Sequence, residues 1–115
     1  MLPKRNRLVK GKDYEKVWRH GRSFFKETVG FKVLKNDLNI SRFGFIVGIK
    51  VSKKAVQRNR IKRQLSEIIR LKINSIKPGY DFLILALPKI LGKKYEATRG
   101  AVEESLGKMG FIKNI

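Results

Sequence analysis

The chain has 115 residues and a formal net charge of +19, with 28 Lys and Arg against 9 Asp and Glu. An excess of this size excludes an ordinary neutral or acidic enzyme and favours a polyanionic partner, either nucleic acid or an anionic membrane. Because 42% of the residues are hydrophobic, the composition also excludes a disordered basic tail and predicts one compact domain over residues 1–115. The chain has no cysteine, which excludes Cys-ligated metal sites and thiol nucleophiles.

The first half of the chain predicts one helix followed by two strands. A basic extended arm over residues 1–10 precedes a short helix from Lys12 to His20, with Gly21 at its C-cap. Alternating apolar residues predict strands at Ser23–Leu34 and Phe43–Lys50, and their adjacency favours an antiparallel hairpin.

The second half predicts helix, strand and helix. Helical periodicity runs from Ala55 to Ile73, and Tyr80–Leu87 is nearly all apolar, which is typical of a strand covered on both faces. An amphipathic helix follows from about Tyr95 to Met109. The order αββαβα describes a single α+β domain in which helices pack on a small sheet. No apolar run approaches the ~20 residues of a membrane span and no signal peptide is visible, so we expect a cytoplasmic protein.

The positive charge is concentrated in the first two thirds of the chain, and especially in the helix predicted at residues 55–73. Residues 1–72 hold 21 basic and 5 acidic side chains, a net of +16, whereas residues 73–115 hold 7 and 4. A helical wheel groups the apolar side chains on one side of that helix, at Ile61, Leu65, Ile68 and Ile69. The opposite side consists of Asn59, Arg63, Ser66 and Arg70, flanked by Arg60 and Lys62.

This helix is suited to dock by one side and bind phosphate with the other. Arginine matches phosphate oxygens with two parallel hydrogen bonds, and the helix N-terminus near Arg58 adds the positive end of a dipole. The alternative is a solvated charged face without a partner. Against it, Glu67 is the only acidic residue between Lys50 and Lys72, so the i,i+4 ion pairs of a merely soluble helix are missing.

The basic run from Lys53 to Arg63 resembles the Arg-Asn-Arg signature of the bacterial ribonuclease P protein subunit. Further similarities follow in the same order between about Arg5 and Leu106. They are Arg5-Asn6-Arg7-Leu8, Asp13-Tyr14, Val17-Trp18-Arg19-His20-Gly21, Arg42-Phe43-Gly44-Phe45 and Gly79-Tyr80-Asp81-Phe82. One departure is Lys50-Val51-Ser52-Lys53-Lys54, which has Ser and one extra residue where the family usually has a Gly before Lys-Ala-Val.

The resemblance implies a subunit that binds a large catalytic RNA, which removes 5′ leaders from precursor transfer RNAs with magnesium ions. The magnesium would be held mainly by the RNA, so no catalytic or metal-binding residue and no organic cofactor are expected in this chain. The expected partners are the catalytic RNA and precursor transfer RNA, without a membrane or a protein oligomer. The family fold further implies a mixed sheet and a left-handed βαβ crossover around the Arg-Asn-Arg helix, where a right-handed one is the general rule.

Two RNA-facing surfaces are expected on this basis. The surface for the catalytic RNA comprises Lys53, Lys54, Arg58, Asn59, Arg60, Lys62, Arg63 and Arg70. The cleft for the leader comprises Arg5, Arg7, Tyr14, Trp18 and Lys32. Tyr14 and Trp18 share a helix face, where aromatic rings stack on unpaired bases at ~1–3 kcal/mol per base. The competing interpretation is that both pack in the core.

Other functions remain open from the sequence. One is a ribosomal or general RNA-binding protein without associated cleavage. Another is a peripheral binder of anionic membranes, which is weaker because the charged helix lacks the broad Trp, Phe and Leu face of interfacial helices. The single histidine, His20, lies at a helix end and is expected to be a surface residue, and no paired carboxylates suggest a nuclease site.

Overall fold

The computed structural model describes residues 2–112, and this part of the chain forms three α-helices, four strands and three short 3-10 turns. The helices are α1 (Gly11–His20), α2 (Ala55–Lys72) and α3 (Tyr95–Lys108). The strands are β1 (Arg22–Phe25), β2 (Val29–Lys35), β3 (Arg42–Ile46) and β4 (Tyr80–Ala86). All three predicted helices are confirmed to within one residue at each end, and the fold is a small α+β domain with a mixed sheet.

The strand pairing differs from the predicted hairpin. The sheet order is β1-β2-β4-β3, with β4 antiparallel to β2 and parallel to β3. The strand predicted at residues 23–34 is two strands, because the chain turns between Lys26 and Val29 and forms the β1–β2 hairpin. The predicted pairing of residues 23–34 with residues 43–50 is therefore wrong. The nearly all-apolar β4 occupies the place between β2 and β3, where its side chains are covered on both faces.

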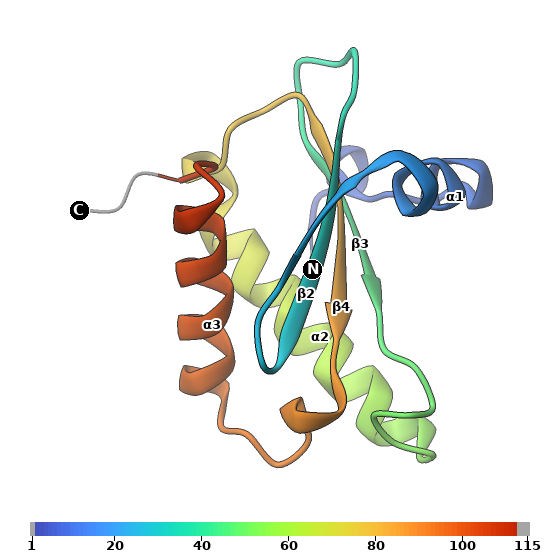
Figure 1. Cartoon of the computed structure of the whole chain (residues 1–115), viewed down its shortest axis with the longest axis vertical. Coiled ribbons are helices and arrows are strands. Elements are labelled where there is room, and N and C mark those ends of the chain that lie inside the picture. Colours follow the sequence, from blue (N-terminus) through green and yellow to red (C-terminus); the bar gives the residue numbers. More distant parts are fainter. Residues whose placement is uncertain (1, 113–115) are drawn as a thin grey trace.

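The helices lie on opposite faces of the sheet (Figure 1). α2 and α3 cover one face, and the main core forms there around three fully buried rings, Phe31, Phe43 and Phe82. The rings of Phe43 and Phe82 are stacked with centroids 4.8 Å apart. The apolar side of α2 is buried as predicted, and α2 joins the parallel neighbours β3 and β4, the crossover for which the family resemblance implies a left hand.

α1 covers part of the other face and forms a smaller cluster there. Val17 of α1 is fully buried against Leu8 and Leu83 of β4. The helix ends at Gly21, where a Cβ atom would lie 2.5 Å from the carbonyl oxygen of Val17. Gly21 thus permits the close approach of α1 to β2, and its backbone is extended rather than left-handed.

The segment predicted as a basic extended arm lies against the sheet edge. Arg7 forms a parallel bridge with Phe43, and the Leu8 backbone N–H donates to the Phe43 carbonyl at 2.9 Å. Leu2 is buried in the main core and Leu8 in the smaller cluster. The two leucines anchor the basic residues between them beside β3.

Candidate nucleic-acid interface

The loop before α2 is held by Ser52, the residue at which the chain departs from the family pattern. Its hydroxyl accepts a hydrogen bond from the Lys54 backbone N–H at 3.1 Å and also bonds the Gln57 side chain. The guanidinium of Arg58 donates to the Ser52 carbonyl at 3.0 Å. Arg58 therefore has a structural role in fixing the start of α2, in addition to the RNA-binding role predicted for it.

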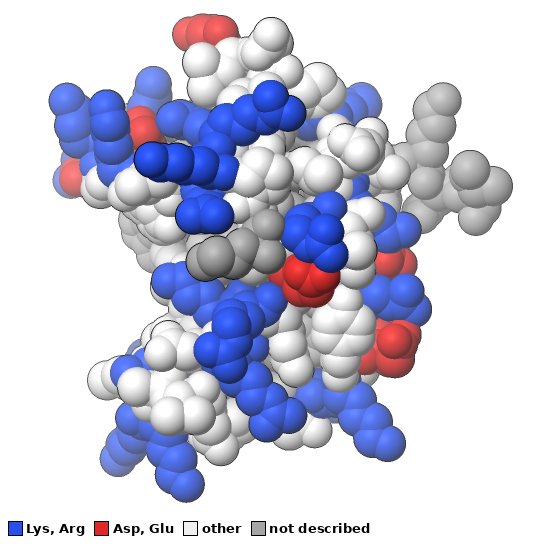
Figure 2. Space-filling model, turned by 180° about the vertical axis from the view of Figure 1, so that it is seen from behind, with Lys and Arg blue, Asp and Glu red and all other residues white. Residues whose placement is uncertain are grey.

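Most of the cations predicted to bind the catalytic RNA are exposed on or before α2. They are Lys53, Lys54, Arg60, Lys62, Arg63 and Arg70, and the polar Asn59 is exposed among them. Figure 2 shows the side of the molecule on which α2 lies, where Lys and Arg side chains outnumber Asp and Glu. Basic side chains are thus spread over this side of the molecule, with uncharged surface between them.

Arg70 differs from the other cations of α2 because it is ion-paired within the helix. Its Nε donates to Glu67 at 2.9 Å, and a second hydrogen bond joins Nη2 to the same carboxylate. This pairing lowers the pKa of Glu67 and raises that of Arg70. Within residues 2–112, α2 has no i,i+4 ion pair, as expected, but this pair forms at i,i+3. It leaves Arg70 less suited to bind phosphate than Arg60 or Arg63.

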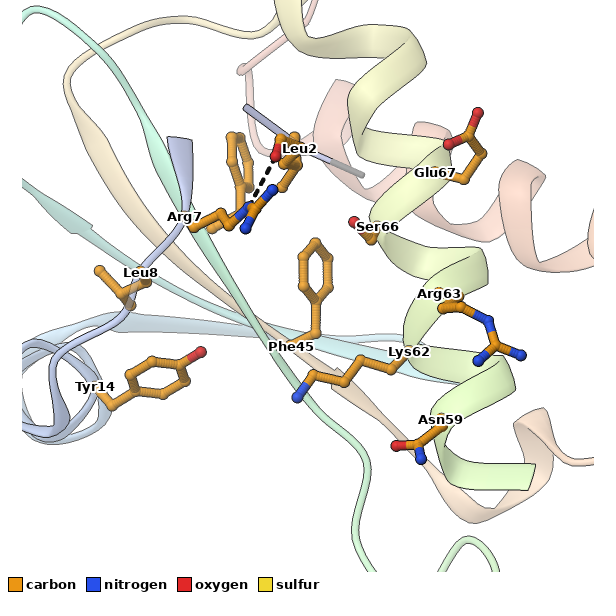
Figure 3. A pocket seen from close by; sticks show the side chains of 11 residues that line it. Leu2, Arg7, Leu8, Tyr14, Phe45, Asn59, Lys62, Arg63, Ser66 and Glu67 are labelled. Carbon is orange, nitrogen blue, oxygen red and sulfur yellow. Dashed lines mark hydrogen bonds between the residues drawn. The ribbon is translucent and has the colours of Figure 1, made fainter. Parts of the chain in front are cut away.

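A half-open pocket of about 610 Å³ lies between α2, β3 and the N-terminal segment (Figure 3). The lining consists of Leu2, Arg7, Leu8, Tyr14, Phe43, Phe45, Asn59, Lys62, Arg63, Ser66 and Glu67. In Figure 3 the ring of Phe45 stands between Tyr14 and α2, and Arg7 donates to the Leu2 carbonyl at 2.8 Å. The pocket thus combines aromatic side chains with three cations, Arg7, Lys62 and Arg63, and one carboxylate, Glu67.

This pocket joins residues that were predicted to belong to two separate surfaces. Arg7 and Tyr14 come from the predicted leader cleft, and Asn59, Lys62 and Arg63 from the predicted surface for the catalytic RNA. The two surfaces are therefore neighbours across the edge of the sheet. The aromatic residues of β3, Phe43 and Phe45, were not predicted to belong to a site. The available signal was their alternation on a strand that precedes the basic helix in sequence.

Tyr14 packs on the edge strand β3 over Gly44, where only glycine leaves room for the tyrosine ring. A Cβ atom at Gly44 would lie 2.7 Å from the Tyr14 ring and from its hydroxyl oxygen. Burial against β3 raises the pKa of Tyr14 above its ordinary value, while a hydrogen bond with the Phe45 backbone acts in the opposite direction. Tyr14 is thus partly a packing residue and partly a wall of the pocket.

Trp18 lies on the α1 side of the sheet with 49% of its surface exposed. The Lys32 ammonium of β2 lies 4.7 Å from the centre of the Trp18 ring and donates to the Trp18 carbonyl at 3.1 Å. The core interpretation is therefore wrong for Trp18, since Val17 supplies the buried contact of this helix. Trp18 and Lys32 lie together, but outside the pocket, and Arg5 is exposed on the turn at residues 4–6 and lines neither place.

Two carboxylates of this region, Asp13 and Asp81, belong to a structural network around Arg42. Arg42 of β3 binds Asp81 of β4 through two hydrogen bonds of 2.6 and 2.9 Å and reaches Asp13 of α1 at 3.4 Å. Asp81 is 6% exposed and also accepts from Asn36 at 2.8 Å. The hydrogen bond to Asp81 is the main cause of the raised pKa of Arg42. The network fastens α1 to the sheet.

Residues 2–112 offer no group of three or more His, Asp or Glu side chains placed to hold a metal ion. Within the same residues, no helix combines the length and the apolar character needed to cross a membrane. The structure thus defines a small basic α+β protein with a cationic helix and an aromatic pocket beside it.

The comparisons with known proteins identify the family. The Ribonuclease P family model matches residues 2–110. The ribonuclease P protein component of Synechocystis sp. is 38% identical over 112 residues, covering 96% of this chain and 90% of that protein. The corresponding protein of Clostridium acetobutylicum is 34% identical over 111 residues, covering 95% and 92%. The chain belongs to the ribonuclease P protein component family, which implies an RNA partner and a role in transfer RNA processing.

Solved structures agree with this fold. The ribonuclease P protein of Thermotoga maritima superposes with a TM-score of 0.81 at 26% identity, covering 89% of this chain and 96% of that one. A mutant ribonuclease P protein of Staphylococcus aureus has a TM-score of 0.88 at 22% identity, covering 95% and 92%, and supports the fold.

Proposed function

We propose that this chain is the protein subunit of a ribonuclease P in which it binds both the catalytic RNA and the 5′ leader of precursor transfer RNA. The observation that carries the proposal is the pocket at the β3 edge, which brings Arg7 and Tyr14 together with Asn59, Lys62 and Arg63. A site that combines cations with aromatic side chains suits a single strand that leaves a folded RNA.

The two sides of the interface have different roles in this proposal. The cations of α2 neutralise phosphates of the catalytic RNA, because guanidinium groups bind phosphate oxygens in pairs and the helix has only one acidic residue. The unpaired leader is held by Arg7 and Tyr14 of the pocket and by Trp18 and Lys32 on the α1 side of the sheet. Stacking and charge hold it there with little dependence on its sequence.

Hydrolysis itself belongs to the RNA in this proposal. The RNA also holds most of the magnesium ions, and the protein contributes cations and stacking surfaces without an organic cofactor. The proposed setting is the cytoplasm, with the chain acting as a single copy and without contact to a membrane.

The test is to add the full chain to a bacterial ribonuclease P RNA at a magnesium concentration at which the RNA alone is inactive. We expect cleavage of precursor transfer RNA at the mature 5′ end to be restored, and the Arg60→Ala/Arg63→Ala variant to require more protein for the same rate. Tight binding to the RNA without restored cleavage would contradict the proposal and favour a general RNA-binding protein.

A further inference from the structure

The α1 side of the sheet contains an apolar row that α1 covers only in part. Phe25 of β1 is opposite Gly30 of β2, Gly30 is opposite Leu85 of β4, and Leu85 is opposite Ile46 of β3. These side chains point away from the main core, which takes the alternate residues of each strand. Leu85 and Ile46 are half-buried at the margin of the smaller cluster, so the row runs beside α1 across all four strands.

Phe25 is the most exposed member of this row, with 55% of its surface accessible. Its ring lies directly over Gly30, because a Cβ atom there would be 2.5 and 2.6 Å from two of the ring carbons. The absence of a side chain at Gly30 lets the ring lie against the sheet and present its other side outward. Phe25 belongs to neither of the two hydrophobic clusters formed by residues 2–112. The outward side of its ring is therefore open to a ligand.

The surroundings of this row are suited to a polyanion with planar groups. Lys32 is two residues from Gly30 on β2, about 6.8 Å along the strand, and carries its ammonium against Trp18. Trp18 and Phe25 thus lie on the same side of the sheet, Trp18 against Lys32 and Phe25 over Gly30, two residues away on β2. Among the strand residues of this face the one carboxylate is Asp81, which Arg42 and Asn36 already bind. No uncompensated negative charge of the strands opposes an approaching phosphate backbone.

We propose that Phe25 is a second stacking platform for unpaired bases and extends the leader surface from Trp18 toward β1. The inference rests on the proposed function and adds to it a residue that neither the family resemblance nor the comparisons assign. The occupant is a single-stranded nucleic acid, which combines planar rings with the negative charge that matches Lys32, and the proposed function makes it RNA. A strand held at both rings would span the exposed part of β2.

Binding of a short oligouridylate to the full chain tests this inference directly. Trp18 is the sole tryptophan, so its fluorescence reports an RNA strand that reaches this face. Phe25→Leu keeps an apolar side chain over Gly30 but removes the ring. Gly30→Ala leaves Phe25 in the sequence and forces its ring off the sheet, which the exposed side chain can do without disturbing the core. Leu91→Ala is the control, because Leu91 is similarly exposed, at 45%, but lies in the loop after β4.

We expect both Phe25→Leu and Gly30→Ala to weaken oligouridylate binding at least about fivefold, the lower end of what one stacked base contributes. Leu91→Ala should bind as the native chain does, and all three melting curves should remain close to native. If Gly30→Ala melts early, Phe25→Leu alone decides the result. Native affinity in Phe25→Leu, with Trp18 fluorescence still responding, would overturn the role of Phe25 and leave the proposed function intact. No fluorescence response even in the native chain would overturn the leader surface itself.

Discussion

Trp18 is half exposed although its neighbour Val17 is fully buried. The Trp18→Ala variant should therefore lose little stability and should bind precursor transfer RNA more weakly, by about 1–3 kcal/mol for one stacked base. Binding of mature transfer RNA, which lacks the leader, should change little. Melting curves measured beside the affinities for precursor, mature transfer RNA and catalytic RNA check this prediction.

A buried tryptophan would behave differently. Its truncation would lower the free energy of unfolding by about 3–5 kcal/mol and reduce all three affinities together. The sequence could not decide between these outcomes, because Val17 and Trp18 are adjacent on one short helix and both can face the sheet. Which of the two side chains is buried depends on how α1 is rotated about its axis. That rotation is set by the close approach of Gly21 to Val33 and by the ion pair of Asp13 with Arg42, which are contacts between segments distant in sequence.

Tyr14 provides a test by pH. Because burial raises its pKa, the folded chain keeps the phenol neutral at a pH where the unfolded chain ionises it. The unfolded state then binds fewer protons, so the free energy of unfolding should fall as pH rises above about 10, the ordinary value for tyrosine. Denaturant unfolding at increasing pH should show a steeper fall for the native chain than for Tyr14→Phe. Equal slopes in the two proteins would show that Tyr14 ionises alike in both states.

At the scale of elements, α2 is the part that the sequence predicts best. Its apolar side repeats every three to four residues, and the buried residues are the ones that the helical wheel selects. The sheet is predicted less well, because strand order depends on pairings between distant segments. β4 is inserted between β2 and β3 since it needs cover on both faces, a requirement that residues 23–50 alone do not reveal. The pocket could not be predicted from the sequence for the same reason, because α2, β3 and residues 2–14 meet only in the folded chain.

The cations of α2 should not contribute equally to RNA binding. A plot of log affinity for the catalytic RNA against log salt concentration should have a negative slope. In Arg60→Ala/Arg63→Ala the magnitude of this slope should be smaller by about 1.4–1.8, since each phosphate contact contributes about 0.7–0.9. Arg70→Ala should lower it less, because Glu67 already binds that guanidinium. Affinities measured over a range of salt concentrations test this, with Arg99→Ala of α3 as the matched control for an ion-paired arginine. A native affinity independent of salt would contradict the phosphate-binding role.

At the scale of the whole molecule, burial of the hydrophobic core stabilises the folded state, whereas the net charge of +19 destabilises it. Self-repulsion among like charges destabilises the compact state, and bound anions relieve it. The ion pairs of residues 2–112 include Lys26–Glu104 at 2.7 Å and Lys72–Glu103 at 3.5 Å, which join α3 to the turn after β1 and to α2. These two pairs hold elements together, whereas the pairs of Glu67 with Arg70 and of Glu96 with Arg99 lie within single helices. Because cations exceed acids by 19, the molecule keeps a net positive charge that an external polyanion can neutralise.

The free chain should accordingly be more stable in sulfate than in chloride at the same ionic strength. A ligand that binds only the folded state stabilises it by mass action, and the exposed cations of α2 provide sites for the anion that the unfolded chain lacks. Sulfate also stabilises proteins generally by its exclusion from their surface, so the relevant quantity is the difference between the native chain and Arg60→Ala/Arg63→Ala. The rise in melting temperature on exchanging chloride for sulfate should be larger in the native chain. Equal rises in both proteins would show that these arginines form no anion site in the free protein, and that their phosphate contacts arise only when the RNA is bound.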